Sequence, residues 1–142
     1  MKAVQFIALV LSLIGISDSS YLTYHHYTAE AVPCSITGGC EMVLTSAYAE
    51  FHGIPLAAFG VAAYLVAFVL AAISLIGNRL SWKLFGVQAT LMAGFSCWLI
   101  YVQAALVGAF CQFCLLSAAT SISLFILFLI SLVFIRGRKP LA

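Results

Sequence analysis

Four long apolar segments, joined by short polar ones, take up most of this sequence. They run from about residue 3 to 27, 54 to 77, 84 to 107 and 110 to 135. Each is long enough to cross a bilayer, which needs roughly 20 residues. Only 7% of the 142 residues are charged, whereas a soluble domain carries about 25%. The sequence therefore predicts an all-α membrane protein, a bundle of four transmembrane helices that forms one domain over residues 1–142.

The first apolar segment has two interpretations. Lys2 before it resembles the start of a secretory signal, but no small-x-small cleavage site follows. A continuous helix is favoured, and it places Asp18 inside the bundle or close to its end. A carboxyl group within a membrane is a functional candidate, and the alternative is a structural polar contact with Ser19, Ser20 or a neighbouring helix.

The charges distinguish the two ends of the predicted bundle. All four acidic residues lie between residues 18 and 50, and no Lys or Arg occurs between Lys2 and Arg79. Basic residues in short loops stay on the cytoplasmic side. We therefore expect a multi-pass protein of the cell (inner) membrane, with both termini and the turn at 78–83 in the cytoplasm. The net charge of +2 gives no reason to expect a nucleic acid partner.

The acidic loop at about 28–53 is then extracytoplasmic, and it carries Cys34 and Cys40. Glycines at 38–39 break regular structure between these cysteines. The stretch 40–51 predicts a short amphipathic helix on the membrane surface. The second transmembrane helix is expected to begin near residue 54, with Pro55 early in it.

A second cysteine pair, Cys111 and Cys114, lies in the predicted first turn of the fourth helix. Two cysteines three residues apart in that turn are close enough to bridge. A helix N-terminus also favours the thiolate, the form that exchanges disulfides. The remaining cysteine, Cys97, is expected to be a small buried hydrophobic residue of the third helix, without a functional role.

The two pairs can be static disulfides, metal ligands or redox-active groups. The very short ring of a C-x-x-C bridge favours an exchange-active bond over a structural one. Metal binding is the weakest alternative, because a membrane bundle needs no zinc to fold. His25 and His26 are adjacent and cannot share a helical face, so we expect them, and His52, to face solvent or headgroups.

A relay of two thiol pairs needs a final electron acceptor. The chain has no haem, flavin or iron–sulfur signature. In a membrane, a diffusible quinone meets this need. This inference comes from chemistry and does not depend on a motif.

Four stretches of the chain resemble the vitamin K epoxide reductase family in its small bacterial or archaeal form. They are the end of the first helix from Asp18 (DSSYLTY), the loop from Val32 (VPCSITGGCEMVLTS), the start of the second helix from Gly53 (GIPLAAFG) and the stretch from Phe110 (FCQFC). A loop pair, a serine six residues after its second cysteine, a G-I-P start and a late C-x-x-C make a specific combination.

The resemblance implies a four-helix bundle that holds ubiquinone or menaquinone (a naphthoquinone) near its outer surface. Cys111 and Cys114 would be the active-site pair, with Cys114 nearest the quinone, and Cys34 and Cys40 would be the shuttle pair. Cys40 would exchange with Cys111, and Cys34 would meet the thiol of a thioredoxin-like (DsbA-like) protein. Many relatives carry such a domain fused, and we expect it here to be a separate protein.

The expected function is that of a membrane thiol:quinone oxidoreductase that makes disulfides outside the cytosol. The residues expected to contact the quinone are Ser46, Pro55, Phe59, Phe110 and Ala118. Animal relatives have a tyrosine in place of Ala118, so one phenolic hydrogen bond to the quinone is missing. Two alternatives are a quinone-epoxide reductase that runs in the reductive direction and a non-enzymatic membrane subunit with static outer disulfides.

Overall fold

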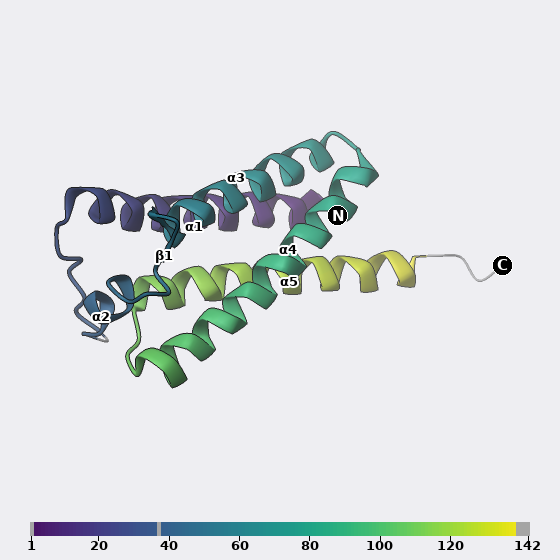
Figure 1. Ribbon diagram of the computed structural model, residues 1–142. Helices are drawn as coiled ribbons and strands as arrows, with labels where there is room; N and C mark the ends of the chain where they lie inside the picture. The colour runs from purple at the N-terminus through teal and green to yellow at the C-terminus, as the bar shows by residue number, and fades with distance from the viewer. Residues whose placement is uncertain (1, 37, 139–142) are drawn as a thin grey trace.

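The computed structural model describes residues 2–36 and 38–138 and contains four long helices (Figure 1). They are α1 (Lys2–Thr28), α3 (Leu56–Leu75), α4 (Arg79–Tyr101) and α5 (Gln112–Gly137). Helix α1 packs against α3 and α5, and α4 packs against the same two helices, which closes the bundle. All four helices are long and apolar enough to cross a membrane. The predicted all-α membrane bundle is confirmed.

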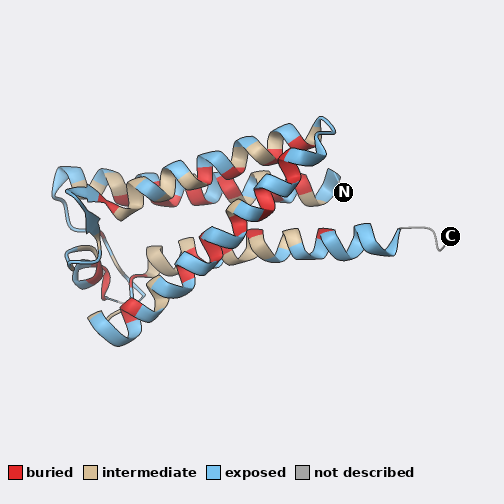
Figure 2. Ribbon diagram, turned by 45° about the vertical axis from the view of Figure 1, so that its right-hand side comes forward, coloured by how far each residue is buried: buried red, intermediate tan, exposed pale blue. Residues whose placement is uncertain are grey.

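Small residues let the helices approach closely. Alanines at positions 8, 67, 71 and 89 are fully buried, and the Tyr64 and Phe85 rings fill the space between them. Gly15 lies so close to Tyr64 that a Cβ added there would lie 2.3 Å from a ring carbon. Figure 2 shows the buried residues on the inward faces of the helices. This packing is typical of membrane bundles, where small residues replace bulky ones at helix contacts.

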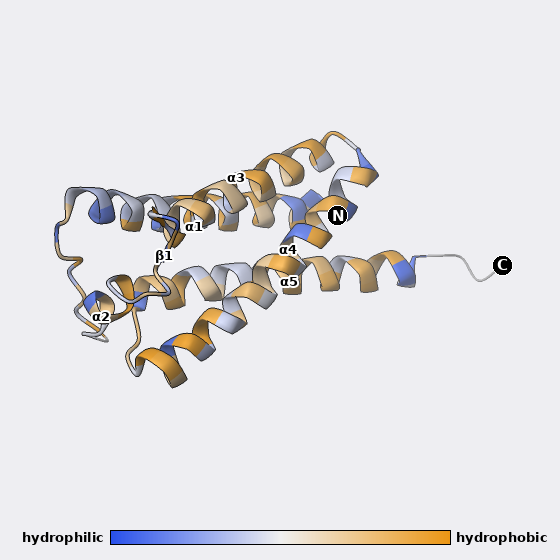
Figure 3. Cartoon of the chain, viewed as in Figure 1, coloured by the Kyte–Doolittle hydropathy of each residue, from blue (hydrophilic) through white to orange (hydrophobic). Residues whose placement is uncertain are grey.

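The outward faces of the helices carry large apolar side chains. Figure 3 shows hydrophobic residues along the length of all four helices, with hydrophilic ones gathered towards the ends. Phe6, Leu91 and Val133, for example, are 61%, 66% and 71% exposed. Such faces would be unfavourable in water, but they suit the hydrocarbon of a bilayer.

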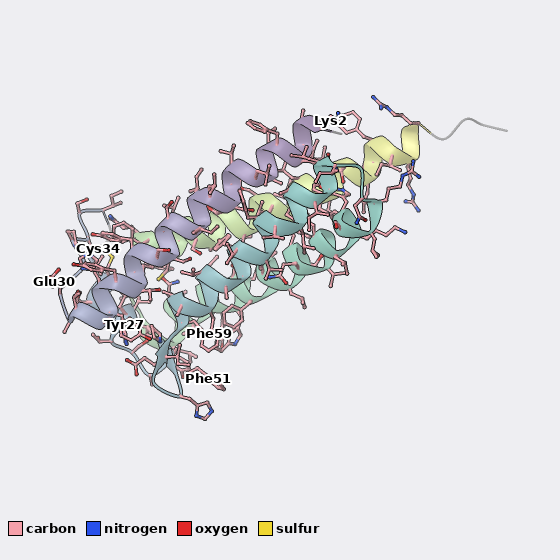
Figure 4. All side chains as sticks on the ribbon, turned by 90° about the horizontal axis from the view of Figure 1, so that it is seen from above. Lys2, Tyr27, Glu30, Cys34, Phe51 and Phe59 are labelled. Atoms are coloured by element: carbon pink, nitrogen blue, oxygen red, sulfur yellow. A yellow bond between two sulfur atoms is a disulfide. The ribbon has the colours of Figure 1, made fainter. Side chains whose placement is uncertain are left out.

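The two ends of the bundle differ in chemistry. Figure 4 shows Lys2 at one end and Glu30, Cys34 and Phe51 at the other. The start of α1, the α3–α4 turn and the end of α5 share the first end, as Figure 1 shows. The basic residues within 2–138 therefore gather at the end opposite the disulfide, as the charge pattern predicts. Which end faces the cytoplasm remains a prediction.

The turn before the third transmembrane helix is shorter than predicted. The Asn78 side chain caps α4, because its Oδ1 accepts hydrogen bonds from the backbone N–H of Leu80 (3.0 Å) and Ser81 (3.2 Å). The helix therefore begins at Arg79 instead of near residue 84. At its other end α4 continues into a π-helix, η1 (Val102–Val107), which ends at Gly108.

The predicted surface helix at 40–51 is wrong in length. The short helix α2 spans only Cys40–Leu44. It ends there because Ser46 bonds back to the Val43 carbonyl, which accepts from the backbone N–H (3.3 Å) and from the hydroxyl (2.7 Å) of Ser46. These bonds use the carbonyl that a continuing helix would offer to residue 47.

A small hairpin, which the sequence analysis does not predict, follows α2. Strand β1 (Glu50–Phe51) pairs antiparallel with β2 (Ile54–Pro55). The two residues between them, His52 and Gly53, have φ values of 51° and 80°, as a tight two-residue hairpin requires. Pro55 is consequently the N-cap of α3 and lies just before the helix.

Candidate active site

Cys111 and Cys114 are positioned by the start of α5. Cys111 is the N-cap residue and is fully buried, and Cys114 lies half-buried in the first turn. Both are thiols in this structure. A hydrogen bond with the Cys114 side chain lowers the pKa of Cys111 from its ordinary value of 9.0 to about 7. Burial opposes this change, and the backbone amides of Cys114 and Phe113 add to it.

We expect alkylation of Cys111 in the reduced protein to be half-maximal near pH 7, since the thiolate is the reacting form and its pKa is about 7. The labelled fraction should rise with pH through this midpoint. Iodoacetamide labelling followed by peptide mass spectrometry measures it. The unfolded protein is the control, because the ordinary midpoint of a cysteine is 9.0. An equal midpoint in the folded protein would contradict the depressed pKa.

Cys34 and Cys40 form a disulfide in the loop between α1 and α2, with their Cα atoms 5.9 Å apart. The two sulfurs are not equally accessible. Cys40, at the start of α2, is fully buried, whereas Cys34 is only partly buried. A thiolate arriving from outside the bundle therefore meets Cys34 first.

The loop disulfide lies against the turn that carries the C-x-x-C. Cys40 and Cys111 belong to one buried apolar cluster. Gly39 packs on the backbone of Phe110, and a Cβ at Gly39 would lie 2.6 Å from the Phe110 carbonyl oxygen. Only glycine allows this approach. The fold thus brings together two cysteine pairs that lie far apart in the sequence.

Gln112, between Cys111 and Cys114, makes a second link to the loop. Its Oε1 accepts a hydrogen bond from the backbone N–H of Ile36 at 2.8 Å. The loop that carries the disulfide is therefore fastened to the first residue of α5. The sequence offers no local signal for this contact, because it joins residues from opposite parts of the chain.

A cavity of about 1070 Å³ opens on the other side of Cys114. Its wall comes from all four long helices, η1, the outer loop and the hairpin, and is largely apolar. Cys114 lines the cavity, and Cys111 does not. Of the residues expected to contact a quinone, those in the wall are Ser46, Pro55, Phe59 and Ala118. Phe110 lies outside the wall, exposed in the turn before Cys111.

Two polar residues in this wall were missed by the sequence analysis. The Tyr64 hydroxyl donates to the Ser117 carbonyl oxygen (2.6 Å) and lies 2.7 Å from the Ser121 hydroxyl. Gln103 accepts a hydrogen bond from the backbone N–H of Cys111. Their position inside apolar segments was the available signal. Placing a polar side chain within a membrane costs free energy, and such residues often have a functional role.

Comparison with known proteins identifies the chain. The model of the vitamin K epoxide reductase family matches residues 6–129, which include both cysteine pairs. The chain belongs to the vitamin K epoxide reductase family. It is also similar to the thiol-disulfide oxidoreductase LTO1 of Arabidopsis thaliana, with 39% identity over 122 residues, covering 78% of this chain and 32% of LTO1. The chain thus spans about a third of the length of that curated relative.

The histidines of this vitamin K epoxide reductase family member differ from expectation. His25 and His26 do not simply face solvent, because both are partly buried in the cavity wall. His26 Nε2 lies 3.1 Å from Glu50 Oε1, which ties the end of α1 to β1. The His25 ring packs edge-on against Tyr21 with ring centroids 4.4 Å apart. Within the described ranges, no three His, Cys, Asp or Glu side chains gather as metal ligands.

Two further residues of this family member also need comment. Asp18 is buried, and neither carboxyl oxygen has a hydrogen-bond partner among the described residues, so the alternative of a structural polar contact with Ser19, Ser20 or a neighbouring helix is not found there. It lines a groove between α1 and α5 with Tyr21 and other residues. The expectation that Cys97 is buried is wrong, since it is exposed on α4. Lipid, unlike water, imposes no cost on an outward apolar thiol.

Proposed function

We propose that this protein is a membrane thiol:quinone oxidoreductase that generates disulfides outside the cytosol. Electrons pass from a separate thioredoxin-like protein to Cys34 and Cys40, then to Cys111 and Cys114, and finally to ubiquinone or menaquinone. Membership in the vitamin K epoxide reductase family and likeness to a thiol-disulfide oxidoreductase support redox chemistry at these pairs. The quinone and the protein partner are the more specific parts of the proposal.

The observation that carries the proposal is an unbroken path from the surface to the cavity. Cys34 is the accessible end, Cys40 shares a buried cluster with Cys111, and Cys114 lines the cavity. All four cysteines belong to this cluster, Cys34 and Cys114 as its partly buried members. A static outer disulfide would need neither the second pair nor a cavity beside it.

The exchange steps balance without any further reactant. A partner thiolate attacks Cys34, the Cys34–Cys40 bond breaks, and Cys40 leaves as a thiolate; the partner's second thiol then completes its own disulfide. The Cys40 thiolate attacks the oxidised C-x-x-C pair at Cys111, and Cys34 closes the loop disulfide again, which leaves Cys111 and Cys114 reduced.

In the final step the two thiols become a Cys111–Cys114 disulfide, and their two electrons and two protons convert the quinone to a quinol. The structure has a disulfide in the loop and thiols at the C-x-x-C. This arrangement is the state in which the active-site pair is ready to reduce quinone.

The cavity has the size and chemistry that this substrate requires. Ligand cavities commonly measure about 300 to 1,000 Å³ and are mostly apolar with a few polar groups. The apolar wall suits a quinone ring and part of an isoprenoid tail. The basic residues at the opposite end of the bundle support an orientation with the cysteine end outside the cytosol.

The test is quinone reduction by the purified, detergent-solubilised protein with dithiothreitol as the electron donor. We expect equimolar quinol and oxidised dithiothreitol with a short-chain ubiquinone or with menadione, at a rate well above that of the same mixture without protein. A Cys97→Ala variant should match the wild type, because Cys97 lies on the outside of α4. No protein-dependent quinol from folded protein with either quinone would favour a non-enzymatic membrane subunit.

A further inference from the structure

Gln103 occupies an unusual position for an amide side chain. It lies in the π-helix η1 near the end of the third membrane span, and it is only 3% exposed. It also lines the same cavity as Cys114. Single π-helical turns are rare, and many lie at functional sites. Burying an amide in apolar surroundings is costly unless its hydrogen-bonding groups find partners.

The oxygen end of this side chain has a partner. Gln103 Oε1 accepts the backbone N–H of Cys111 at 2.9 Å. The backbone carbonyl of Gln103 also accepts from the N–H groups of Gly108 (2.9 Å) and Ala109 (3.1 Å). Gln103 therefore fixes the turn that leads into the C-x-x-C.

The nitrogen end remains without a partner. No hydrogen bond from Gln103 Nε2 is formed within residues 2–36 and 38–138. The amide cannot rotate to exchange its two ends, because Nε2 would then place its own N–H against the N–H of Cys111. The amide donor of an otherwise buried side chain is thus held in the wall of the cavity that Cys114 lines.

Three other donors of the wall are already in use. The Tyr64 hydroxyl donates to the Ser117 carbonyl, and Gln88 Nε2 donates to the Ala63 carbonyl at 3.3 Å. The Ser46 hydroxyl donates to Val43. A quinone carries two carbonyl acceptors and no donor, so it needs a donor from the protein. Negative charge also develops on these oxygens as electrons arrive, where a fixed donor is most effective.

We propose that Gln103 binds a quinone carbonyl oxygen through Nε2 while its Oε1 holds the Cys111 backbone. One side chain then sets the position of the thiol pair and of its electron acceptor. This inference rests on the proposed quinone reductase activity.

The decisive variant is Gln103→Glu. Assayed at about pH 9, where the glutamate is ionised, the variant keeps an oxygen to accept the Cys111 N–H but has no donor for the quinone. We expect reduction of the protein's cysteine pairs by dithiothreitol to stay within about threefold of wild type. The step that reduces menadione or a short-chain ubiquinone should slow by about 100-fold, as removal of one fixed donor does at other sites of developing negative charge. A Gln103→Met variant, which loses both groups, should be impaired in both measurements.

The two proposals fail in different ways. If the wild type reduces no quinone, the proposed function fails. If the wild type is active and Gln103→Glu reduces quinone within about threefold of it, Gln103 is only a clamp for the Cys111 turn and the inference is overturned.

A measurement on the wild type covers the case in which the variants do not fold. The chain has four glutamines, so side-chain ¹⁵N labelling of glutamine gives four amide signals. Substitution of Gln5, Gln88 and Gln112 assigns that of Gln103 by elimination. Saturating menadione should shift this signal. An unshifted Gln103 amide in quinone-saturated protein would overturn the inference.

Discussion

Replacing Cys114 by alanine should abolish quinone reduction, with a loss of at least about 1,000-fold in rate. Of the two C-x-x-C sulfurs, that of Cys114 is the one in a residue that lines the cavity. Without it, Cys111 cannot form the disulfide that releases two electrons. Alanine leaves the first turn of α5 intact, because the helix bonds there come from the backbone. The assay is dithiothreitol-driven quinol formation, followed by the loss of quinone absorbance.

The matched control for this variant is Cys97→Ala, which removes a thiol from the outside of α4. Its activity should equal that of the wild type. The melting temperature of each variant in detergent shows whether it is folded. Quinol formation by folded Cys114→Ala at even a tenth of the wild-type rate would mean that another sulfur reduces the quinone.

Replacing Cys34 by alanine should stop turnover with a protein electron donor while sparing turnover with dithiothreitol. Cys34 is the accessible half of the loop disulfide, whereas Cys40 is fully buried. A folded dithiol partner cannot reach the buried sulfurs. We expect a loss of at least about 100-fold with a reduced thioredoxin-like protein. Dithiothreitol is small enough to reduce the active-site pair directly, so its rate should change by less than about threefold.

A Cys34→Ala/Cys40→Ala double variant controls for a trapped intermediate. In the single variant, the remaining Cys40 thiol can form a mixed disulfide with Cys111, which lies in the same cluster. The double variant cannot, so it should keep the dithiothreitol activity even if the single variant loses it. Normal turnover of the protein partner by Cys34→Ala would show that the order of the relay is wrong.

The sequence predicts the membrane bundle well because hydrophobic length is a local property. It predicts helix ends less well, since these depend on single caps. Asn78 caps α4, so this helix begins earlier than the positions of the basic residues suggest. An asparagine just before an apolar segment is a sequence signal for such a cap. The His52–Gly53 hairpin turn was readable too, but a strand of two residues leaves no periodicity to detect.

The four cysteines could be found from sequence because their spacing carries the chemistry. The residues that hold these cysteines in place could not be found in this way. Gln103 accepts a hydrogen bond from Cys111, and Gln112 accepts one from Ile36. No local sequence pattern predicts either contact. His26 and Glu50 meet only because the loop folds back over the end of α1. Such residues become visible once the distant parts of the chain are placed together.

The π-helix makes this site sensitive to chain length as well as to side-chain chemistry. An α-helix advances about 100° per residue, and η1 holds more residues in its turn than an α-helix would. Deleting one residue from 104–107 would remove the extra residue of the π turn and shorten the connection between Gln103 and Cys111. The hydrogen bond from the Cys111 N–H to the Gln103 side chain would then be displaced or lost. We therefore expect homologous chains to vary in which residues form this segment, but to keep the same number of residues in it.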